Sequence, residues 1–287
     1  MCIRDRLGNR RAYKGSYNSL NSFTGDNLDI CFEDITQGWL LNYESWLRAK
    51  GNKETTISIQ FRTLRSVYNK AIKRKCVGKE YYPFEDFHIN KFNVHTDKRA
   101  ISKNDVLKII SADLTGKSEY VKFSRDIFVF SYLCGGINFC DVASLTKENI
   151  LNGRLFYVRQ KTGKQINLCL TKNASAIIDK YYKGGKGFLF PILDVTRHIT
   201  ATQRENRLHK VLGQVDKSLK IVAQIAKVDV NLTTYVARHS YATVLKRSGV
   251  PTSIICESLG HSSERVTQIY LDSFENEQID EAMKNLL

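Results

Sequence analysis

The stretch TTYVARHSYATVLKRSG, residues 233–249, is the part of the sequence from which the fold can be read most directly. Its apolar residues recur at helical spacing and predict one buried stripe: Ala237, Tyr241, Val244 and Leu245. Arg238 lies at the edge of that stripe, and Tyr235 lies nearly one helical turn before it. A guanidinium group at such an edge needs an anion. That anion is either a carboxylate of the same protein or a phosphate, which two parallel hydrogen bonds can clamp.

A basic hairpin precedes this helix in the sequence. In LFYVRQKTGKQINLCL, residues 155–170, apolar residues alternate along the second half, which predicts two β-strands joined at Thr162-Gly163. Three basic side chains crowd the projecting turn: Arg159, Lys161 and Lys164. Such a turn is either merely solvated, or it reaches into a DNA groove and places an ammonium group beside a leaving oxygen.

Two further segments carry polar residues of chemical interest. LGHSSERVTQIYLDSF, residues 259–274, places Tyr270 nine residues after His261, on a short helix that a serine can cap. DIFVFSYLCGGINFCDVASL, residues 126–145, predicts a buried helix, a Gly-Gly break and a second helix that contains Asp141. Taken singly, side chains of these kinds are more often structural than catalytic.

The first hundred residues read as helical. Residues 34–51 and 55–75 each carry an apolar stripe at helical spacing, and SKND at 102–105 begins another helix with a capping serine. The polar, weakly periodic residues 89–101 predict an interdomain linker. Basic residues at the edge of the 55–75 stripe or away from it form either a solvated face or a DNA-facing one: Arg62, Arg65, Lys70, Lys73 and Arg74.

The composition is that of a strongly basic globular protein. The 287 residues are enough for two domains, and 44 Lys and Arg against 29 Asp and Glu give a net charge of +15. Nucleic acid is the commonest partner for such a charge, with an anionic membrane surface as the alternative. No apolar run reaches the roughly 18 residues of a spanning helix. Seven singly placed cysteines predict neither a disulfide framework nor a zinc site, so we expect a cytoplasmic protein without a metal.

The N-terminus reads MCIRDRLGNRR and shows no clear opening element. We expect that the chain is truncated here and that its first half-dozen residues are not native domain sequence. A longer gene with an upstream domain would support this hypothesis. A ribosome-binding site directly before Met1 would contradict it.

The order and spacing of these motifs resemble those of the tyrosine recombinases, the phage-integrase family, over nearly the whole chain. The resemblance rests on a glycine six residues before Asp141, on the K-T-G hairpin, on R-H-S-Y-A-T, and on L-G-H-S-S with its tyrosine nine residues after the histidine. It implies a mainly α fold. A helical, SAM-like core-binding domain is expected at residues 10–93, and a mixed, mostly α catalytic domain with a small β-sheet or hairpin at residues 98–287. The sequence most resembles integrases of mobile elements from gut bacteria.

The same resemblance implies roles for the site residues. Tyr270 is expected to attack the scissile phosphate and to become a 3′-phosphotyrosine, while Arg238 and His261 bind that phosphate. Lys161 is expected to donate a proton to the departing 5′-hydroxyl, and Asp141 to support the first active-site arginine. Five basic residues are expected to contact DNA: Arg62, Arg65, Lys73, Arg159 and Lys164. No cofactor is needed, because the phosphotyrosine conserves the bond energy.

Two positions depart from the family pattern. Tyr235 stands where a histidine is preferred, and it can still donate or accept a hydrogen bond. Asn138 stands where the first arginine is usual, three residues before the acidic residue, and an amide carries no charge. Losing one such contact costs about 10²–10³ in rate, so another basic residue substitutes, or the enzyme is slow, or it is inactive. The candidates nearest in the sequence are Arg125, Lys147 and Arg154.

We therefore expect a site-specific DNA recombinase that clamps duplex DNA and acts as a homotetramer on two DNA sites. The alternatives are a catalytically inactive DNA-binding protein of the same fold and a topoisomerase-like enzyme that relaxes DNA. The tail FENEQIDEAMKNLL, residues 274–287, has loosely helical apolar spacing and is expected to pack on a neighbouring subunit. Assembly on DNA that survives deletion of residues 275–287 would contradict that expectation.

Overall fold

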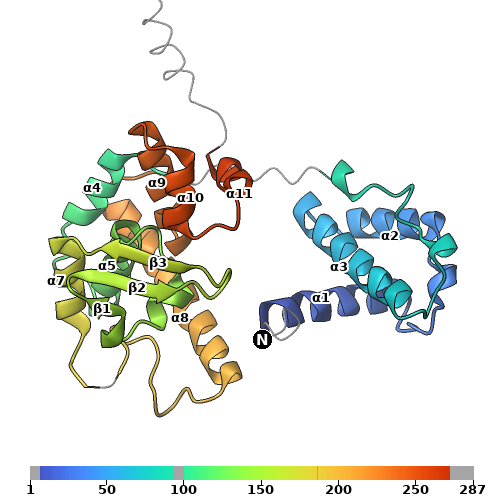
Figure 1. Cartoon of the computed structure of the whole chain (residues 1–287), viewed down its shortest axis with the longest axis horizontal. Helices are drawn as coiled ribbons and strands as arrows, with labels where there is room; N and C mark the ends of the chain where they lie inside the picture. Colours follow the sequence, from blue (N-terminus) through green and yellow to red (C-terminus); the bar gives the residue numbers. More distant parts are fainter. Residues whose placement is uncertain (1–6, 93–99, 186, 272–287) are drawn as a thin grey trace, which may run out of the picture. The chain divides into compact units, whose positions relative to one another are not determined.

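The structure divides the chain into two compact units, Met1–Asp97 and Lys98–Leu287, each with its own hydrophobic core (Figure 1). It is a computed structural model that describes residues 7–92, 100–185 and 187–271. Both units are mainly helical, and the second also contains a three-stranded sheet, so the predicted fold class is confirmed. Among the described helices, none is long and apolar enough to cross a lipid bilayer.

Helices joined by short 3₁₀ turns form the first unit. The helices are α1 (Leu7–Phe23), α2 (Gln37–Ala49) and α3 (Glu54–Lys73), and the turns are Phe32–Asp34, Lys79–Tyr81 and Ile89–Lys91. The two predicted apolar stripes are confirmed, because Tyr43 of α2 and Phe61 and Tyr68 of α3 are completely buried. The rings of Tyr43 and Phe61 lie 5.5 Å apart, in a core built largely from aromatic side chains.

The expectation that the chain starts without a clear element is wrong from residue 7 onward, where α1 begins. This helix is largely polar, and hydrogen bonds attach it to its neighbours. The Tyr13 hydroxyl lies 2.9 Å from Ser66 Oγ, and Ser19 Oγ lies 2.7 Å from the Tyr43 hydroxyl. Two apolar side chains near its C-terminal end also pack against the core of the unit. The rest of the helix has too few apolar residues to form the regular stripe that reveals helices in a sequence. Residues 1–6, to which the truncation hypothesis applies, lie outside the described residues.

The segment between the units is shorter than the predicted linker, residues 89–101. Ile89 and Phe92 belong to the core of the first unit, where they are 5% and 2% exposed. At the other end, Ile101 is buried in the second unit and its N–H donates to Ser240 Oγ at 3.0 Å. The linker prediction is therefore wrong at both ends. A few apolar side chains within a polar stretch are enough to anchor it, which its average composition does not show.

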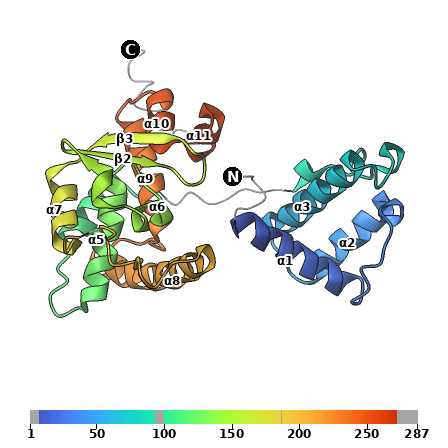
Figure 2. The same ribbon diagram turned by 60° about the horizontal axis from the view of Figure 1, so that its bottom comes forward.

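In the second unit, helices pack against a small antiparallel sheet (Figure 2). The second unit contains, in chain order, α4 (Lys103–Ser111), α5 (Glu119–Leu133), α6 (Phe139–Ala143), a 3₁₀ turn (Lys147–Asn149), β1 (Ile150–Leu151), β2 (Arg154–Val158), β3 (Gln165–Cys169), α7 (Lys172–Tyr181), α8 (Ala201–Ile225), α9 (Thr234–Arg247), α10 (Thr252–Leu259) and α11 (Glu264–Tyr270). Helix α5 packs against α7, α8 and α9. The predicted break after it is confirmed, because Gly135 and Gly136 both have positive φ and α6 follows.

The predicted hairpin is confirmed as β2 and β3, which pair antiparallel with Val158 opposite Gln165. Strand β1 pairs with the other edge of β2, and at two residues it is too short for a sequence pattern to reveal. Helix α10 packs against β3 and α9, and α11 packs against α10 and α9 (Figures 1 and 2). This packing brings the C-terminal end of α10 beside the β2–β3 turn, where the predicted site residues can meet.

Candidate functional site

Arg238 of α9 is fully buried, which corrects the prediction that it lies at the edge of the buried face. It is 1% exposed. Its Nη1 donates to the carbonyl oxygen of Gly136 at 2.8 Å, and its Nη2 donates to the carbonyl oxygen of Leu259. The backbone of Gly136 can come this close to α9 only because it carries no side chain: a Cβ there would lie 2.8 Å from the Cα of Arg238. Backbone carbonyls from two other segments therefore hold this guanidinium group in the interior.

Arg159 directly follows β2 and is also buried, so the expectation that its side chain crowds an exposed turn is wrong. It is 3% exposed, and its Nη1 donates to the carbonyl oxygen of Gly260 at 2.7 Å. Its Nε has no hydrogen-bond partner among the described residues. Strand alternation could have revealed this burial, because Arg159 continues the face of β2 on which Leu155 and Tyr157 are buried.

The β2–β3 turn is fastened on two sides. Thr162 Oγ1 donates to the carbonyl oxygen of Gly260 at 2.9 Å. On the other side, the N–H of Gln160 donates to Asp141 Oδ1 at 3.0 Å. Two exposed lysines belong to this turn: Lys161 and Lys164. The turn therefore presents their ammonium groups from a fixed position between α6 and the end of α10.

His261 connects the end of α10 to α11. It is 3% exposed, and its Nδ1 lies 2.9 Å from Oγ1 of Thr267, on the helix that ends at Tyr270. Burial lowers the pKa of His261 to about 3, and four cations act in the same direction: Arg238, Arg159, Lys161 and Lys164. The imidazole is therefore neutral at neutral pH, although positive charges surround it.

Asp141 of α6 is a buried acidic group beside this cluster of cations. It is 3% exposed, and burial raises its pKa, although the N–H of Gln160 and the charges of Arg159 and Arg238 act to lower it. Asn138 is the N-terminal cap residue of α6, and its half-buried side chain also acts to lower the pKa of Asp141. Among the residues that the structure describes here, one carboxyl group thus stands against two arginines and two lysines, so positive charge is in excess.

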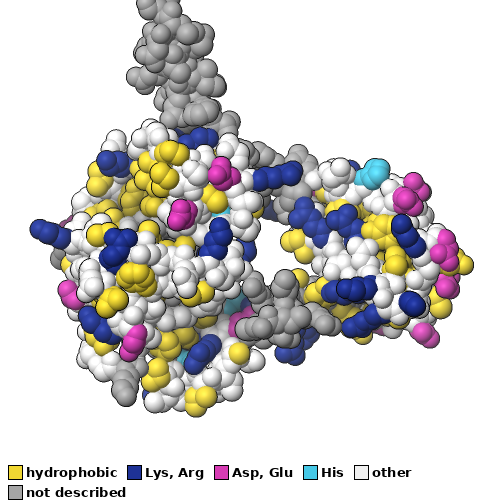
Figure 3. Space-filling view, in the orientation of Figure 1, with side chains coloured by type: hydrophobic (Ala, Val, Ile, Leu, Met, Phe, Trp, Pro, Cys, Tyr) yellow, Lys and Arg dark blue, Asp and Glu magenta, His cyan; other side chains and the backbone are white. Residues whose placement is uncertain are grey.

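The other predicted residues lie on α3, α9 and α11. Tyr235 is 42% exposed, and its ring meets the ring of His239 edge-on with centroids 4.6 Å apart. Tyr270 is the last residue of α11. Three predicted DNA contacts are exposed on α3 of the first unit: Arg62, Arg65 and Lys73. Figure 3 shows Lys and Arg side chains spread over both units on the face in view.

The three basic residues considered as substitutes for the first arginine make contacts elsewhere. Arg125 forms an ion pair with Asp126 at 2.6 Å. Lys147 lies over a tyrosine ring at 5.9 Å. Arg154 is exposed and donates to Asn167 Oδ1 at 2.7 Å. It lies at the other end of β2 from Arg159, and five residues of strand span roughly 17 Å. All three therefore have partners outside the cluster around Arg238.

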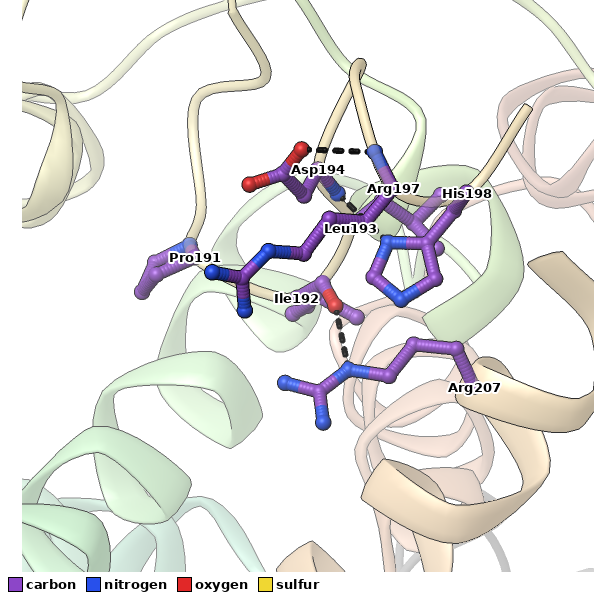
Figure 4. Close-up of a pocket in the computed structure, with 7 residues that line it drawn as sticks. All are labelled: Pro191, Ile192, Leu193, Asp194, Arg197, His198 and Arg207. Carbon is purple, nitrogen blue, oxygen red and sulfur yellow. Dashed lines mark hydrogen bonds between the residues drawn. The ribbon is translucent and has the colours of Figure 1, made fainter. Parts of the chain in front are cut away.

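A pocket of about 250 Å³ lies in another part of the second unit, between α8 and the segment that precedes it (Figure 4). Arg197 and Arg207 contribute to its lining. Arg207 Nε donates to the carbonyl oxygen of Ile192 at 2.9 Å, and Asp194 Oδ1 accepts from the N–H of Arg197 at 3.0 Å. None of the predicted site residues lines this pocket, and its bonds serve to fasten the segment to α8.

The cluster at the end of α10 is suited to binding an anion that gains charge during a reaction. Guanidinium groups match the geometry of phosphate oxygens, and each can donate two parallel hydrogen bonds. Donors that are already fixed in place stabilise developing charge without reorganising. Arg238 meets this condition, because two backbone carbonyls restrain it.

Comparisons with known proteins relate the chain to one family. A family model described as phage integrase family matches residues 99–277, and one described as phage integrase SAM-like domain matches residues 3–93. The tyrosine recombinase XerD of Halalkalibacterium halodurans is 24% identical over 239 residues, covering 83% of this chain and 77% of that protein. The integrase of Escherichia phage P2 is 21% identical over 257 residues, covering 90% of this chain and 67% of that protein. A lambda integrase dimer bound to a COC′ core site has the same fold, with a TM-score of 0.67 and 16% identity over 94% of this chain and 92% of that chain.

Proposed function

Because this chain belongs to the phage integrase family, the tyrosine recombinases, and therefore recombines DNA at specific sites, we propose that Tyr270 is its nucleophile and that the cluster around Arg238 binds the scissile phosphate. The hydroxyl oxygen of Tyr270 attacks phosphorus, and a 3′-phosphotyrosine forms as the bond to the 5′-oxygen breaks. This intermediate keeps the energy of the phosphodiester bond. A 5′-hydroxyl from a partner strand can then reverse the step and join the exchanged strands.

Arg238 and His261 are the proposed ligands of the phosphate in this reaction. Arg238 is suited to the role because its side chain is buried and restrained, so that it needs no ordering when DNA binds. His261 is suited to it as a neutral donor. When the hydroxyl of Thr267 donates to Nδ1, the ring proton is on Nε2, which can donate to a phosphate oxygen.

Lys161 is the proposed general acid, which protonates the departing 5′-oxygen. Its turn is fastened to Gly260 and to Asp141, so the ammonium group starts from a defined position. Proton donation to a leaving group contributes roughly 10²–10⁴ in rate. Asp141 is proposed to support the site by fixing the turn through its bond to Gln160.

The observation that carries this assignment is the meeting of three distant motifs at the end of α10. The carbonyl oxygen of Leu259 accepts from Arg238, and that of Gly260 accepts from Thr162 of the hairpin. The next residue, His261, is bonded to the helix of Tyr270. The residues that the family pattern marks for catalysis therefore share anchors within three consecutive positions of the chain.

A nicked suicide duplex tests the proposed nucleophile. The duplex carries the repeat that borders the gene's own DNA segment, and its nick lets the cleaved end diffuse away, so that the covalent adduct accumulates. We expect the wild-type chain to form an adduct that is detected by gel shift under denaturing conditions, and Tyr270→Phe to form none because it lacks the attacking oxygen.

Tyr270→Phe should bind the same duplex as tightly as the wild type, which provides the control for folding. Absence of an adduct with the wild-type chain would favour the inactive DNA-binding alternative. Relaxation of supercoiled DNA without recombination between paired sites would favour the topoisomerase-like alternative.

The two units of the chain are proposed to have separate roles, one in DNA binding and one in catalysis. Residues 10–93 are proposed as the core DNA-binding domain, with the exposed basic residues of α3 as its contacts, and residues 98–287 as the catalytic domain. Exchange of strands between two duplexes involves four cleavage events, which supports a tetramer on DNA. The tail expected to join neighbouring subunits, residues 274–287, lies outside the described residues, so its role stays a prediction.

A further inference from the structure

The proposed site needs a second fixed positive charge, because Asn138 occupies the position of the first arginine. Two arginines on one phosphate would neutralise both non-bridging oxygens as negative charge develops on them. Arg125, Lys147 and Arg154 make other contacts, as described above. A substitute is therefore sought among the basic residues that lie near the site in space, whatever their distance from Asn138 in the sequence.

Arg159 is buried and retains hydrogen-bond donors, unused by the described residues, that could bind an anion. It is 3% exposed, and its hydrogen bond to Gly260 uses only Nη1. Its Nε is buried without a hydrogen-bond partner in the part of the chain that the structure describes. Nor does any described carboxylate oxygen lie within 4.0 Å of its guanidinium group. A buried cation without a paired anion is costly, and a bound phosphate would remove that cost.

Arg159 is also held in the same way as Arg238, by the next peptide group along the chain. The carbonyl oxygen of Leu259 accepts from Arg238, and the carbonyl oxygen of Gly260 accepts from Arg159. These carbonyls end α10, where unpaired acceptors carry partial negative charge and favour cations. The two guanidinium groups are therefore anchored on consecutive peptide groups, immediately before His261.

Gly260 makes this second anchor possible. Its φ is +61°, and a Cβ there would lie 3.2 Å from Cδ of Arg159 and 2.8 Å from Cδ1 of Ile166. The end of α10 therefore passes the arginine at a distance that a side chain would prevent. The charges of Arg159 and Arg238 both act on the pKa of His261 and on that of Asp141, which agrees with one shared site.

We propose that Arg159 replaces the missing first arginine and binds the scissile phosphate beside Arg238. Nη1 stays on the carbonyl oxygen of Gly260, and Nε with the second terminal nitrogen donates to a non-bridging oxygen. The assignment rests on the proposed function, because it adds a phosphate contact to the same site. It makes Arg159 a catalytic residue, in place of the DNA-contacting turn residue that its sequence position suggested.

The variant Arg159→Ala tests the proposal in the full chain, with Arg154→Ala as the matched control. Arg154 is an exposed arginine at the other end of the same strand. The probe is the nicked border-repeat duplex, and the readouts are the rate of adduct formation and the Kd of the duplex. We expect Arg159→Ala to lower the rate about 10²–10³-fold, as for loss of one fixed donor, with Kd changed much less. Arg154→Ala should leave both unchanged.

A duplex with a methylphosphonate at the scissile position separates a role on the phosphate from a role in folding. The methyl group replaces a charged oxygen, so the phosphorus centre is neutral and needs one cation fewer. We expect the penalty of Arg159→Ala to shrink to less than about tenfold on this substrate, from the 10²–10³-fold of a lost donor. Equal penalties on the two substrates would overturn the proposal, because a purely structural arginine does not sense the charge of the phosphate.

Two further variants keep the proposal testable if Arg159→Ala does not fold. Arg159→Lys keeps a charge and is compared on the same pair of substrates. Asn138→Arg added to Arg159→Ala returns a guanidinium group to the usual family position, and it should recover adduct formation. Equal rates for Arg159→Ala and the wild type would overturn this inference and leave the proposed function standing. Absence of adduct from the wild type would overturn both.

Discussion

His261 shows at the scale of one residue how strongly this site controls charge. Burial and the surrounding arginines and lysines lower its pKa to about 3, from an ordinary value of about 6.5. The unfolded chain binds a proton at this histidine below about pH 6.5, whereas the folded chain does not until the pH is near the lowered pKa. The stability that depends on a neutral His261 is therefore fully present above the ordinary pKa. It is lost as the pH falls toward the lowered pKa of the folded chain.

We expect the free energy of unfolding to fall more steeply with decreasing pH in the wild type than in His261→Gln. Between about pH 6.5 and about pH 5, the extra slope should approach about 1.4 kcal/mol per pH unit, the value for one proton. Urea unfolding at several pH values measures it, and glutamine provides a polar side chain that does not titrate. Parallel curves for the two chains would show that folding does not change the pKa of this histidine.

The Gly135-Gly136 link between α5 and α6 lies against α9, and how closely it does so is a property of elements rather than of one side chain. We expect Gly136→Ala to be destabilising for two reasons: a left-handed conformation costs about 1–2 kcal/mol, and overpacking adds about 1–3 kcal/mol. Gly153→Ala is the matched control, because Gly153 also has positive φ but a Cβ there would meet nothing within 4 Å beyond its chain neighbours. Urea unfolding should show the larger loss for Gly136→Ala, and equal losses would mean that α9 moves aside.

Elements whose signals are local could be predicted from the sequence. The stripes of α2 and α3, the break between α5 and α6, and the β2–β3 hairpin follow from apolar spacing and glycine positions, and the structure contains them. Helix α1 could not be predicted in this way, because polar bonds such as that between Tyr13 and Ser66 attach it. Nor could the extent of the linker, since single apolar residues fix its ends.

The sequence proposes which residues form the site, but it does not show how deeply their side chains are buried. Motif spacing brought Arg238, His261 and Lys161 together as a hypothesis. The burial of Arg238 depends on a carbonyl 102 positions away in the chain, and that of Arg159 on one 101 positions away. Contacts of that separation depend on how whole elements pack, so local periodicity leaves them undetermined. The alternation along β2 was the available signal for Arg159.

The net charge of +15 belongs to the whole molecule and predicts how DNA binding depends on salt. We expect the triple variant Arg62→Gln, Arg65→Gln, Lys73→Gln to reduce the slope of log Kd against log salt. The reduction should be about 0.9 for each phosphate contact that is lost. Fluorescence anisotropy with a duplex over a series of salt concentrations measures the slope.

A control of equal net charge removes three cations that carboxylates already neutralise: Arg48→Gln, Lys108→Gln and Lys122→Gln. This triple should leave the slope nearly unchanged, because ion-paired side chains release few counterions from DNA. The same reduction in both triple variants would mean that α3 does not face the phosphates and that only total charge matters.

The two arginine anchors at the end of α10 have a consequence for descent as well as for chemistry. A peptide carbonyl is common to every amino acid, so substitutions along α10 can accumulate without displacing either guanidinium group, provided that the helix still ends at a left-handed glycine. Lambda integrase has the same fold at 16% identity. The feature that such substitutions must preserve is the path of the main chain at the end of α10. Arginines from different elements donate to its carbonyl oxygens: Arg238 from α9 and Arg159 from the end of β2.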